Sequence, residues 1–243
     1  MFPFVRRSSR AGSRRTAGRA LVAAVAVTAL AGSVAACSSG GRSEASQGEI
    51  RTSPIAAQLA NLPARVEDAK IVVGAPDAPR TAQVLVDPHC GYCRIFEGTG
   101  GEALLTAALD GKVKVEYLLA SFLDQGGSGS LKAVNALRAA VDRGRFAEYH
   151  AAVFASQPQG AFTDERLLEI ADRIPGLRSP AFDKAVTGHA YEDWARRAER
   201  AFEATGAEGT PLVLLDGKPL GKDDRSMFDA GAFKKTLAAA GIG

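Results

Sequence analysis

The sequence predicts an α/β fold in which a group of strands is interrupted by an all-helical insertion. Short apolar runs predict strands at 71–73, 84–86 and 113–119, and a helical pattern separates the last two. The stretch 131–205 then shows helical spacing only. A further apolar run, a tight turn and a closing helical pattern follow, so the predicted strands come from both sides of the insertion.

The first predicted strands surround the most informative segment of the chain. Ile71-Val72-Val73 starts the folded domain, and Val84–Val86 is a short buried strand. The helix after this second strand ends at Asp110-Gly111, where glycine is the expected C-terminal signal. Between 113 and 119, apolar residues alternate with charged ones, as in a half-buried strand.

Helix signals are dense within the insertion. Thr163 is a predicted N-cap with two acidic residues after it, and Ser179-Pro180 begins another helix with proline at its first position. Gly144 and Gly206 end two further helices. Trp194 and the other aromatic residues at helical spacing are predicted to be packing residues.

The segment from Asp87 to Arg94 carries the candidate chemistry. Cys90 and Cys93 follow a strand directly and precede a helix directly, which is typical of redox-active cysteine pairs. Backbone N–H groups in the first turn of a helix have no intrahelical partner, so they stabilise an anion such as a Cys90 thiolate. The helix dipole lowers a thiol pKa by about one unit at most, so hydrogen bonds must supply the rest. We expect Cys90 to be the attacking sulfur and Cys93, shielded one turn further on, to resolve the mixed disulfide.

Other interpretations of the cysteine pair stay open. A protonated His89 would help a Cys90 thiolate, but a free imidazole is mostly neutral at pH 7, and a surface loop position fits equally well. A zinc site needs four ligands, and the remaining histidines, His150 and His189, lie far along the chain. A structural disulfide across so short a loop removes little entropy from the unfolded chain. A decayed, inactive site is the third alternative.

The net charge of +3 comes from the N-terminus. The first 36 residues contain six arginines and no acidic residue, and without them the chain has 24 basic and 27 acidic residues, a net charge of −3. Nothing basic then argues for a nucleic-acid partner. The hydrophobic content of 46% is sufficient for a core.

The same N-terminus predicts export. An arginine-rich start is followed by apolar or small residues from Ala20 to Ala36, the pattern of a signal peptide over 1–36. Val34-Ala35-Ala36 before Cys37 resembles a bacterial lipobox, which implies cleavage before Cys37 and its diacylation. An uncleaved N-terminal anchor and a secreted form are the alternatives. In every case the domain lies outside the cytoplasmic membrane, where disulfides persist.

Three regions are expected after the signal peptide. Residues 37–66 would be the lipidated cysteine and a flexible tether, because Ser38 to about Ser53 is rich in serine, glycine and charge. A short helix over 55–62 is an alternative for the end of this tether. Residues 67–243 form the folded domain, with the helical insertion at about 128–206.

These features together resemble the DsbA-like branch of the thioredoxin superfamily over about Ile71 to Gly243. The motifs that carry the resemblance are Gly74-Ala75-Pro76-Asp77-Ala78-Pro79, Asp87-Pro88-His89-Cys90-Gly91-Tyr92-Cys93, the all-helical insertion, and Gly209-Thr210-Pro211 followed by Val213 and Asp216-Gly217-Lys218. The resemblance implies a thioredoxin fold with an all-helical insertion (DsbA-like). It also implies no metal or organic cofactor beyond a redox-active Cys90–Cys93 disulfide.

The resemblance further implies that Pro211 is cis and lies against the cysteines. The residue pattern alone favours a trans proline that starts an edge strand. Because proline has no N–H, the Thr210 backbone would be left free to pair with an extended substrate. Thr210, Pro211, Gly91 and Tyr92 are therefore candidate substrate-binding residues.

Two departures from the family pattern concern the redox chemistry. Many relatives carry a buried acid six residues before the first cysteine, where this chain has Val84, so Glu116 or a water would have to relay the proton of the resolving thiol. The dipeptide Gly91-Tyr92 resembles that of the DsbC-type isomerases. Those proteins dimerise through an added N-terminal domain, for which residues 38–69 are too short.

The sequence therefore predicts an extracytoplasmic, membrane-tethered thiol–disulfide oxidoreductase. Its expected partners are exported proteins with thiols or disulfides and a membrane redox protein, which the tether would favour by effective concentration. Oxidase, reductase and isomerase directions all fit. The alternative is a non-catalytic lipoprotein that binds peptides or a partner beside Pro211, and a depressed thiol pKa would distinguish the enzyme from this binding module.

Overall fold

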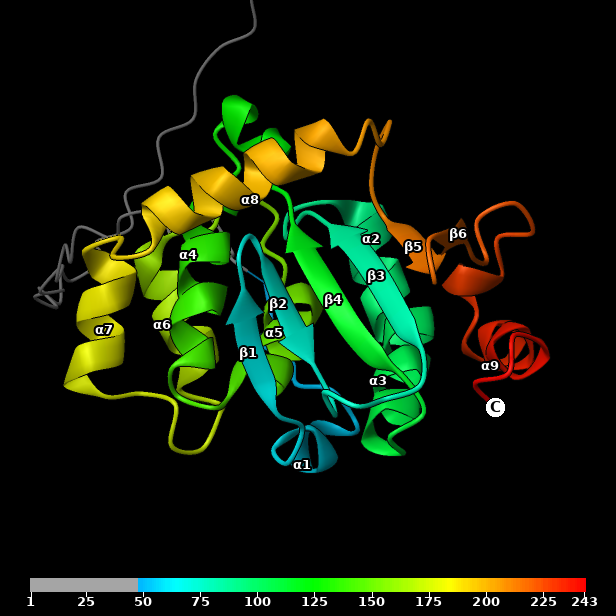
Figure 1. Ribbon diagram of the computed structural model, residues 1–243. Helices are drawn as coiled ribbons and strands as arrows, with labels where there is room; N and C mark the ends of the chain where they lie inside the picture. The colour runs from blue at the N-terminus through cyan, green and yellow to red at the C-terminus, as the bar shows by residue number, and fades with distance from the viewer. Residues whose placement is uncertain (1–47) are drawn as a thin grey trace, which may run out of the picture. The chain divides into compact units, whose positions relative to one another are not determined.

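A six-stranded sheet with the order β1-β2-β4-β3-β5-β6 lies at the centre of the computed structural model, which describes residues 48–243 (Figure 1). Its strands are β1 (Ala64–Glu67), β2 (Lys70–Val73), β3 (Thr81–Val86), β4 (Lys114–Leu119), β5 (Leu212–Leu215) and β6 (Lys218–Pro219). Only β3 and β4 pair in parallel, and the other neighbouring strands are antiparallel. The expected signal peptide and Cys37 lie outside the described residues.

Helices precede, interrupt and follow the strands. They are α1 (Ala56–Leu59), α2 (Gly91–Phe96), α3 (Glu102–Leu109), α4 (Ser130–Val141), α5 (Phe146–Ala155), α6 (Asp164–Ala171), α7 (Pro180–Thr187), α8 (Glu192–Ala204) and α9 (Ala230–Ala239). Shorter turns are the π-helical η1 (Glu97–Gly101) between α2 and α3, and the 3-10 turns η2 (Phe122–Gly126) and η3 (Ser226–Phe228). In the described part of the chain, no helix is long and apolar enough to cross a membrane.

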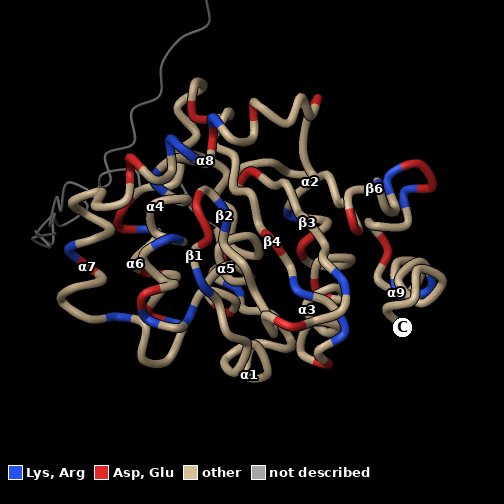
Figure 2. The backbone as a smooth tube through the Cα atoms, in the orientation of Figure 1, with Lys and Arg blue, Asp and Glu red and all other residues tan. Residues whose placement is uncertain are grey.

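The two faces of the sheet are covered by different helices. Val115 and Tyr117 of β4 join the main core, which also contains residues of α2, α3 and α5. Leu118 points to the other face and packs in a second cluster with Phe202 of α8. In Figure 1, α8 runs along the ends of the strands beside the other helices of the insertion, and charges of both signs follow it in Figure 2.

The predicted fold class is confirmed. The order of strand, strand, helix and strand, the helices α4 to α8 and the closing strand pair and helix all occur. The predicted caps are also present: the side chains of Thr163 and Ser179 accept hydrogen bonds from the backbone N–H groups of Arg166 and Phe182, and Pro180 occupies the first position of α7.

The tether expected over 37–66 must be corrected, because the folded part begins earlier. β1 pairs with β2 from Ala64 opposite Val73 to Glu67 opposite Lys70. Leu59 and Leu62 are buried in the main core. Because Leu59 and Leu62 occupy core positions, the segment before residue 67 is part of the folded domain.

Even the beginning of the described chain is bound to the insertion. The Arg51 N–H donates to the Ser156 hydroxyl at 2.8 Å, and that hydroxyl donates to the Arg51 carbonyl at 3.0 Å. Arg166 Nη2 donates to the Gly48 carbonyl at 3.0 Å. Residues 48–51, which the composition places in the tether, are therefore held by Ser156, directly after α5, and by Arg166 of α6.

The π-helical turn η1 allows the segment after the cysteines to approach η3 and α9 closely. A Cβ atom on Gly100 would lie 2.5 Å from the Met227 carbonyl oxygen and 3.1 Å from the Phe233 ring. A Cβ atom on Gly98, in the same turn, would meet nothing within 4 Å. Glycine is therefore required sterically at one of these positions and not at the other.

We expect Gly100→Ala to lower the free energy of unfolding by about 1–3 kcal/mol, the usual cost of forcing an extra methyl group into a packed site. Gly98→Ala is the matched control and should leave stability unchanged or slightly raised, because alanine is the better helix former. Urea denaturation of both variants measures the difference. Equal stabilities would contradict the close approach.

Candidate active site

The cysteine pair lies where β3 passes into α2. The loop after Val86 makes a turn in which the Cys90 N–H donates to the Asp87 carbonyl at 3.0 Å. Cys90 has an extended backbone (φ −73°, ψ 120°) and caps α2, which begins at Gly91. Cys90 is half-buried, whereas Cys93 is fully buried in the main core. Both cysteines are free thiols in the structure.

The pKa values of the two thiols are shifted in opposite directions. The pKa of Cys90 is lowered to about 5, first by the hydrogen bond from the Cys93 thiol and then by Thr210 and the backbone N–H groups of Cys93 and Tyr92, against the effect of burial. Burial and the neighbouring Cys90 charge raise the pKa of Cys93. Near neutral pH, Cys90 is therefore a thiolate and Cys93 a thiol. The expected contribution of hydrogen bonds beyond the helix dipole is confirmed.

The residues just before β5 complete the site from far along the chain. The Thr210–Pro211 peptide bond is cis, as the resemblance implied. The Thr210 carbonyl oxygen lies 3.6 Å from Cys90 Sγ. The Thr210 hydroxyl is buried with no conventional hydrogen-bond partner in the described chain, and the Thr210 side chain lowers the pKa of both cysteines. This hydroxyl was not predicted, since the sequence indicated only a role for the Thr210 backbone.

Asp87 is a further residue that the sequence did not single out. Its side chain is fully buried, and burial raises its pKa to about 6 despite hydrogen bonds from Ser130 and from the backbone N–H groups of His89 and Leu123. The neighbouring Cys90 charge raises this pKa further. The sequence did contain a signal for this residue. Asp87 is an acid that directly follows an apolar strand and lies three residues before Cys90.

His89 is turned toward the insertion. Its Nε2 atom lies 2.7 Å from the Gly160 carbonyl oxygen, and its ring meets Phe162 edge-on at 5.8 Å. Gln157 also donates to the Pro88 carbonyl at 2.9 Å. The loop that leads to Cys90 is therefore fixed from the side of the insertion.

The surface beside Cys90 carries exposed apolar groups. Tyr92 is 59% exposed and Ile95 is 43% exposed. The Tyr92 ring lies 5.8 Å from that of Phe228 in η3. Gly91 is exposed, and a Cβ atom there would meet nothing within 4 Å. The candidate residues Gly91, Tyr92, Thr210 and Pro211 thus lie on the two segments that flank the sulfur.

Glu116 was considered as a proton relay, and the structure does not support that position. Its carboxylate pairs with Lys70 of β2. Along β4, Glu116 alternates with Val115 and Tyr117, which belong to the core that contains Cys93. Glu116 therefore projects from the opposite face of the sheet, because neighbouring residues of a strand point to opposite faces.

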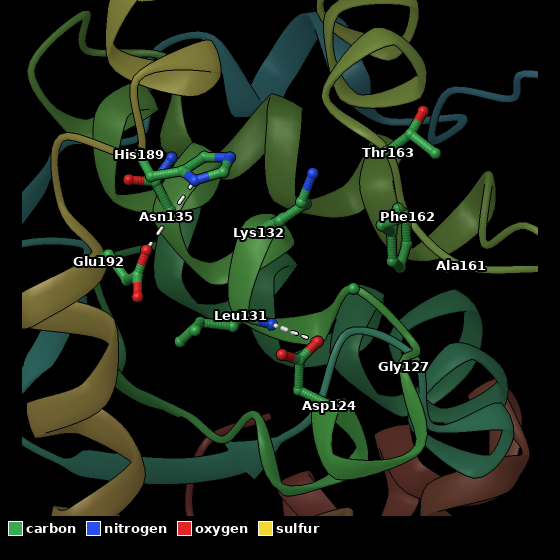
Figure 3. Close-up of a pocket in the computed structure, with 11 residues that line it drawn as sticks. Asp124, Gly127, Leu131, Lys132, Asn135, Ala161, Phe162, Thr163, His189 and Glu192 are labelled. Carbon is green, nitrogen blue, oxygen red and sulfur yellow. Dashed lines mark hydrogen bonds and ion pairs between the residues drawn. The ribbon is translucent and has the colours of Figure 1, made fainter.

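Two further observations concern other kinds of site. In the described residues, no group of three His, Cys, Asp or Glu side chains is arranged to hold a metal ion. A cavity of about 390 Å³ lies between the η2 segment and the insertion, and neither Cys90 nor Cys93 lines it. Figure 3 shows some of its lining residues, among them Lys132, His189 and Glu192. The chemistry of the cysteine pair is therefore separate from this cavity.

The comparisons with known proteins agree with this fold. A family model described as Thioredoxin matches residues 67–230. Among solved structures, the chain is similar to the MdbA protein of Corynebacterium diphtheriae, a thiol-disulfide oxidoreductase, with 23% identity and a TM-score of 0.58, covering 73% of this chain and 93% of that one. It is also similar to BdbD from Bacillus subtilis, with 18% identity and a TM-score of 0.60, covering 75% and 98%.

A short match to a protein of another kind carries no functional information. The hydroxyurea phosphotransferase of Kitasatospora aureofaciens is 66% identical over 29 residues, which are 12% of this chain and 8% of that protein. So small a share of either protein indicates neither a common fold nor a common activity.

We expect Thr210→Val to raise the pKa of reduced Cys90 by about one unit, because the variant removes a hydroxyl that stabilises the thiolate and keeps the shape of the side chain. Thr210→Ser keeps the hydroxyl and should leave the pKa near its wild-type value. The ultraviolet absorbance of the thiolate against pH measures both. An unchanged pKa in the valine variant would show that the hydroxyl does not act on Cys90.

Proposed function

Because the chain belongs to the thioredoxin family, we propose that it is an extracytoplasmic thiol–disulfide oxidoreductase that exchanges disulfides with exported proteins through Cys90 and Cys93. The observation that carries the proposal is the unequal pair of sulfurs. A half-buried Cys90 with a pKa of about 5 stands beside a fully buried Cys93 whose pKa is raised. A low pKa makes a thiol available as thiolate and makes it a good leaving group.

Both halves of an exchange follow from this inequality. In the oxidising direction, a substrate thiolate attacks Cys90 of the disulfide, the bond between the two cysteines breaks, and Cys93 leaves with the electron pair and takes up a proton. A second substrate thiolate then attacks the first substrate sulfur and expels Cys90 as its stable thiolate. In the reducing direction, the Cys90 thiolate attacks a substrate disulfide and Cys93 resolves the mixed disulfide.

Substrate positioning is proposed for the two segments beside the sulfur. The main chain of Thr210, before cis Pro211, would pair with an extended substrate segment next to Cys90. Gly91 leaves the approach to Cys90 open, and the exposed ring of Tyr92 offers an apolar contact. Substrate recognition would then depend less on the amino-acid sequence around the substrate cysteine than on the ability of that segment to adopt an extended conformation.

The proposed location rests on the N-terminal sequence. The signal-like segment 1–36 and the lipobox-like residues before Cys37 support export and attachment to the cell membrane through a lipid on Cys37. A membrane redox protein is the proposed electron partner, since attachment to one membrane raises the effective concentration of each for the other. No cofactor beyond the Cys90–Cys93 disulfide is proposed.

We expect the rate of alkylation of the reduced protein to be half-maximal near pH 5 and constant from about pH 6 upward, since the reactive form is the Cys90 thiolate. Cys93 is buried with a raised pKa and contributes little to this rate. Iodoacetamide labelling followed by mass spectrometry measures the profile. A profile centred near the ordinary thiol pKa of about 8.5 would instead favour a non-catalytic binding protein.

We expect Cys90→Ser to abolish both insulin reduction and thiol oxidation, because it removes the attacking sulfur. Cys93→Ser should instead accumulate mixed disulfides between Cys90 and substrate, because the resolving thiol is missing. Non-reducing electrophoresis shows the trapped species. Full activity of the Cys90→Ser protein would remove the proposal.

A further inference from the structure

The Asp87 carboxylate is buried in the loop that leads to the cysteine pair, and no basic side chain of residues 48–243 forms an ion pair with it. Oδ1 accepts hydrogen bonds from the His89 N–H at 2.9 Å and the Ser130 hydroxyl at 2.6 Å, and Oδ2 accepts from the Leu123 N–H at 3.1 Å. In the described part of the chain, Asp87 takes part in no ion pair. Neutral donors stabilise a buried carboxylate only partly, so its charge is sensitive to other charges nearby.

The Cys90 thiolate is a charge that acts on the Asp87 carboxyl. The Asp87 carbonyl accepts from the Cys90 N–H, and the Asp87 backbone also acts on the Cys93 sulfur. When the disulfide is formed, neither sulfur carries a charge. When the pair is reduced, Cys90 is a thiolate and the two anions repel each other.

The other titratable groups around Asp87 are engaged elsewhere. The His89 ring lies against the Gly160 carbonyl, and the Asp124 carboxylate of η2 accepts from the Leu131 N–H at 3.4 Å. From α4, the group that reaches Asp87 is the neutral Ser130, and Lys132 of that helix pairs with Asp164. The variable charge that acts on Asp87 is therefore the Cys90 thiolate.

We propose that Asp87 is the proton-binding partner of the redox pair: its carboxylate takes up a proton when the Cys90–Cys93 disulfide is reduced and releases it when the disulfide forms. This inference rests on the proposed function, because it needs the pair to cycle between two redox states.

The atoms and electrons of this cycle balance with a dithiol substrate as the reductant. Two substrate thiols lose two electrons and two protons as their disulfide forms, and the bond between Cys90 and Cys93 breaks. Cys93 takes one proton, and Cys90 remains a thiolate. The second proton binds Asp87 in the pH range where its carboxyl titrates, and passes to solvent at higher pH.

The direction of the effect follows from linkage. Burial raises the Asp87 pKa to about 6, and the Cys90 thiolate adds a smaller part of this rise. The disulfide carries no charge and lacks this part, so the same carboxyl ionises at a lower pH in the oxidised state. By reciprocity, an ionised Asp87 destabilises the reduced state and makes the pair less oxidising. The effect is present above about pH 6 and vanishes at a pH where Asp87 is protonated in both states.

Asp87→Asn tests the charge, and Ser130→Ala is the matched control. The asparagine variant removes the charge, whereas the alanine variant removes one bond between loop and insertion and keeps the charge. We expect the equilibrium constant for oxidation of glutathione by Asp87→Asn to lie within about twofold of the wild-type value at pH 5, where Asp87 is largely protonated in the reduced state. At pH 8 the equilibrium constant of the variant should exceed the wild-type value by about threefold to tenfold. A tenfold increase corresponds to a reduction potential about 30 mV higher. Ser130→Ala should stay within twofold of wild type at pH 8.

A second measurement needs no variant. The carboxyl carbon of Asp87, followed by NMR in ¹³C-labelled wild-type protein, should titrate at a higher pH in the reduced than in the oxidised state. Equal midpoints in the two states would overturn the inference, as would equal, pH-independent shifts of the equilibrium in both variants. A wild-type pair that does not equilibrate with glutathione at all would remove the proposed function, and the proton coupling with it.

Discussion

A negative charge on Cys90 is the interaction on which the rest of the site depends. The charge stands at the first turn of α2, and its main support is the Cys93 thiol one turn further along the same helix. The second support, Thr210, comes from just before β5, at the far end of the insertion in the sequence. These groups meet because β3 and β5 are neighbours, with Val84 opposite Val213. The sheet thus converts two distant segments into one anion-binding site.

The insertion does more than cover the sheet, since it holds the loop that presents Cys90. Three consecutive loop residues are fixed by it: Asp87 by Ser130, Pro88 by Gln157 and His89 by Gly160. Burying Asp87 in this way is unfavourable. Its pKa is about 6, above the ordinary value of 3.8, so folding stability falls as the pH rises through this window, by roughly 3 kcal/mol at neutral pH. Because burying Asp87 lowers folding stability, its presence is better explained by a role in the redox reaction than by a contribution to the fold.

The parts of this structure that were predictable from sequence are those set by local signals. Thr163 and Ser179 identify helix starts because a cap depends on neighbouring residues only, and the spacing of the cysteines depends on one helical turn. The cis state of Pro211 followed only from the resemblance, because the isomer of a proline bond is fixed by tertiary context.

What could not be predicted depends on partners distant in the sequence. Asp87 is bonded to Leu123 and Ser130, which reach it only after β4 has paired with β3. The expected tether ended at residue 66, within the edge strand β1, because a four-residue strand with two apolar residues gives too weak a pattern to predict. The face on which Glu116 lies could not be predicted, because alternation along one strand does not say which face a neighbouring helix covers.

The arrangement of buried acids explains how the site works with an apolar residue at Val84. Val84 and Cys93 belong to the same apolar core, and burial there raises the pKa of Cys93, so the proton stays on this sulfur while Cys90 is charged. Glu97, four residues after Cys93, faces a histidine: its Oε2 lies 3.2 Å from His150 Nε2, which forms an ion pair when the imidazole is protonated. Among residues 48–243, Asp87 is a buried acid that acts on the cysteine pair and forms no ion pair with a basic side chain. A carboxylate at position 84, in the core that contains Cys93, would add a second buried negative charge to the one that Asp87 already supplies. Asp87 therefore supplies a buried acid near the cysteine pair, whereas position 84 is apolar.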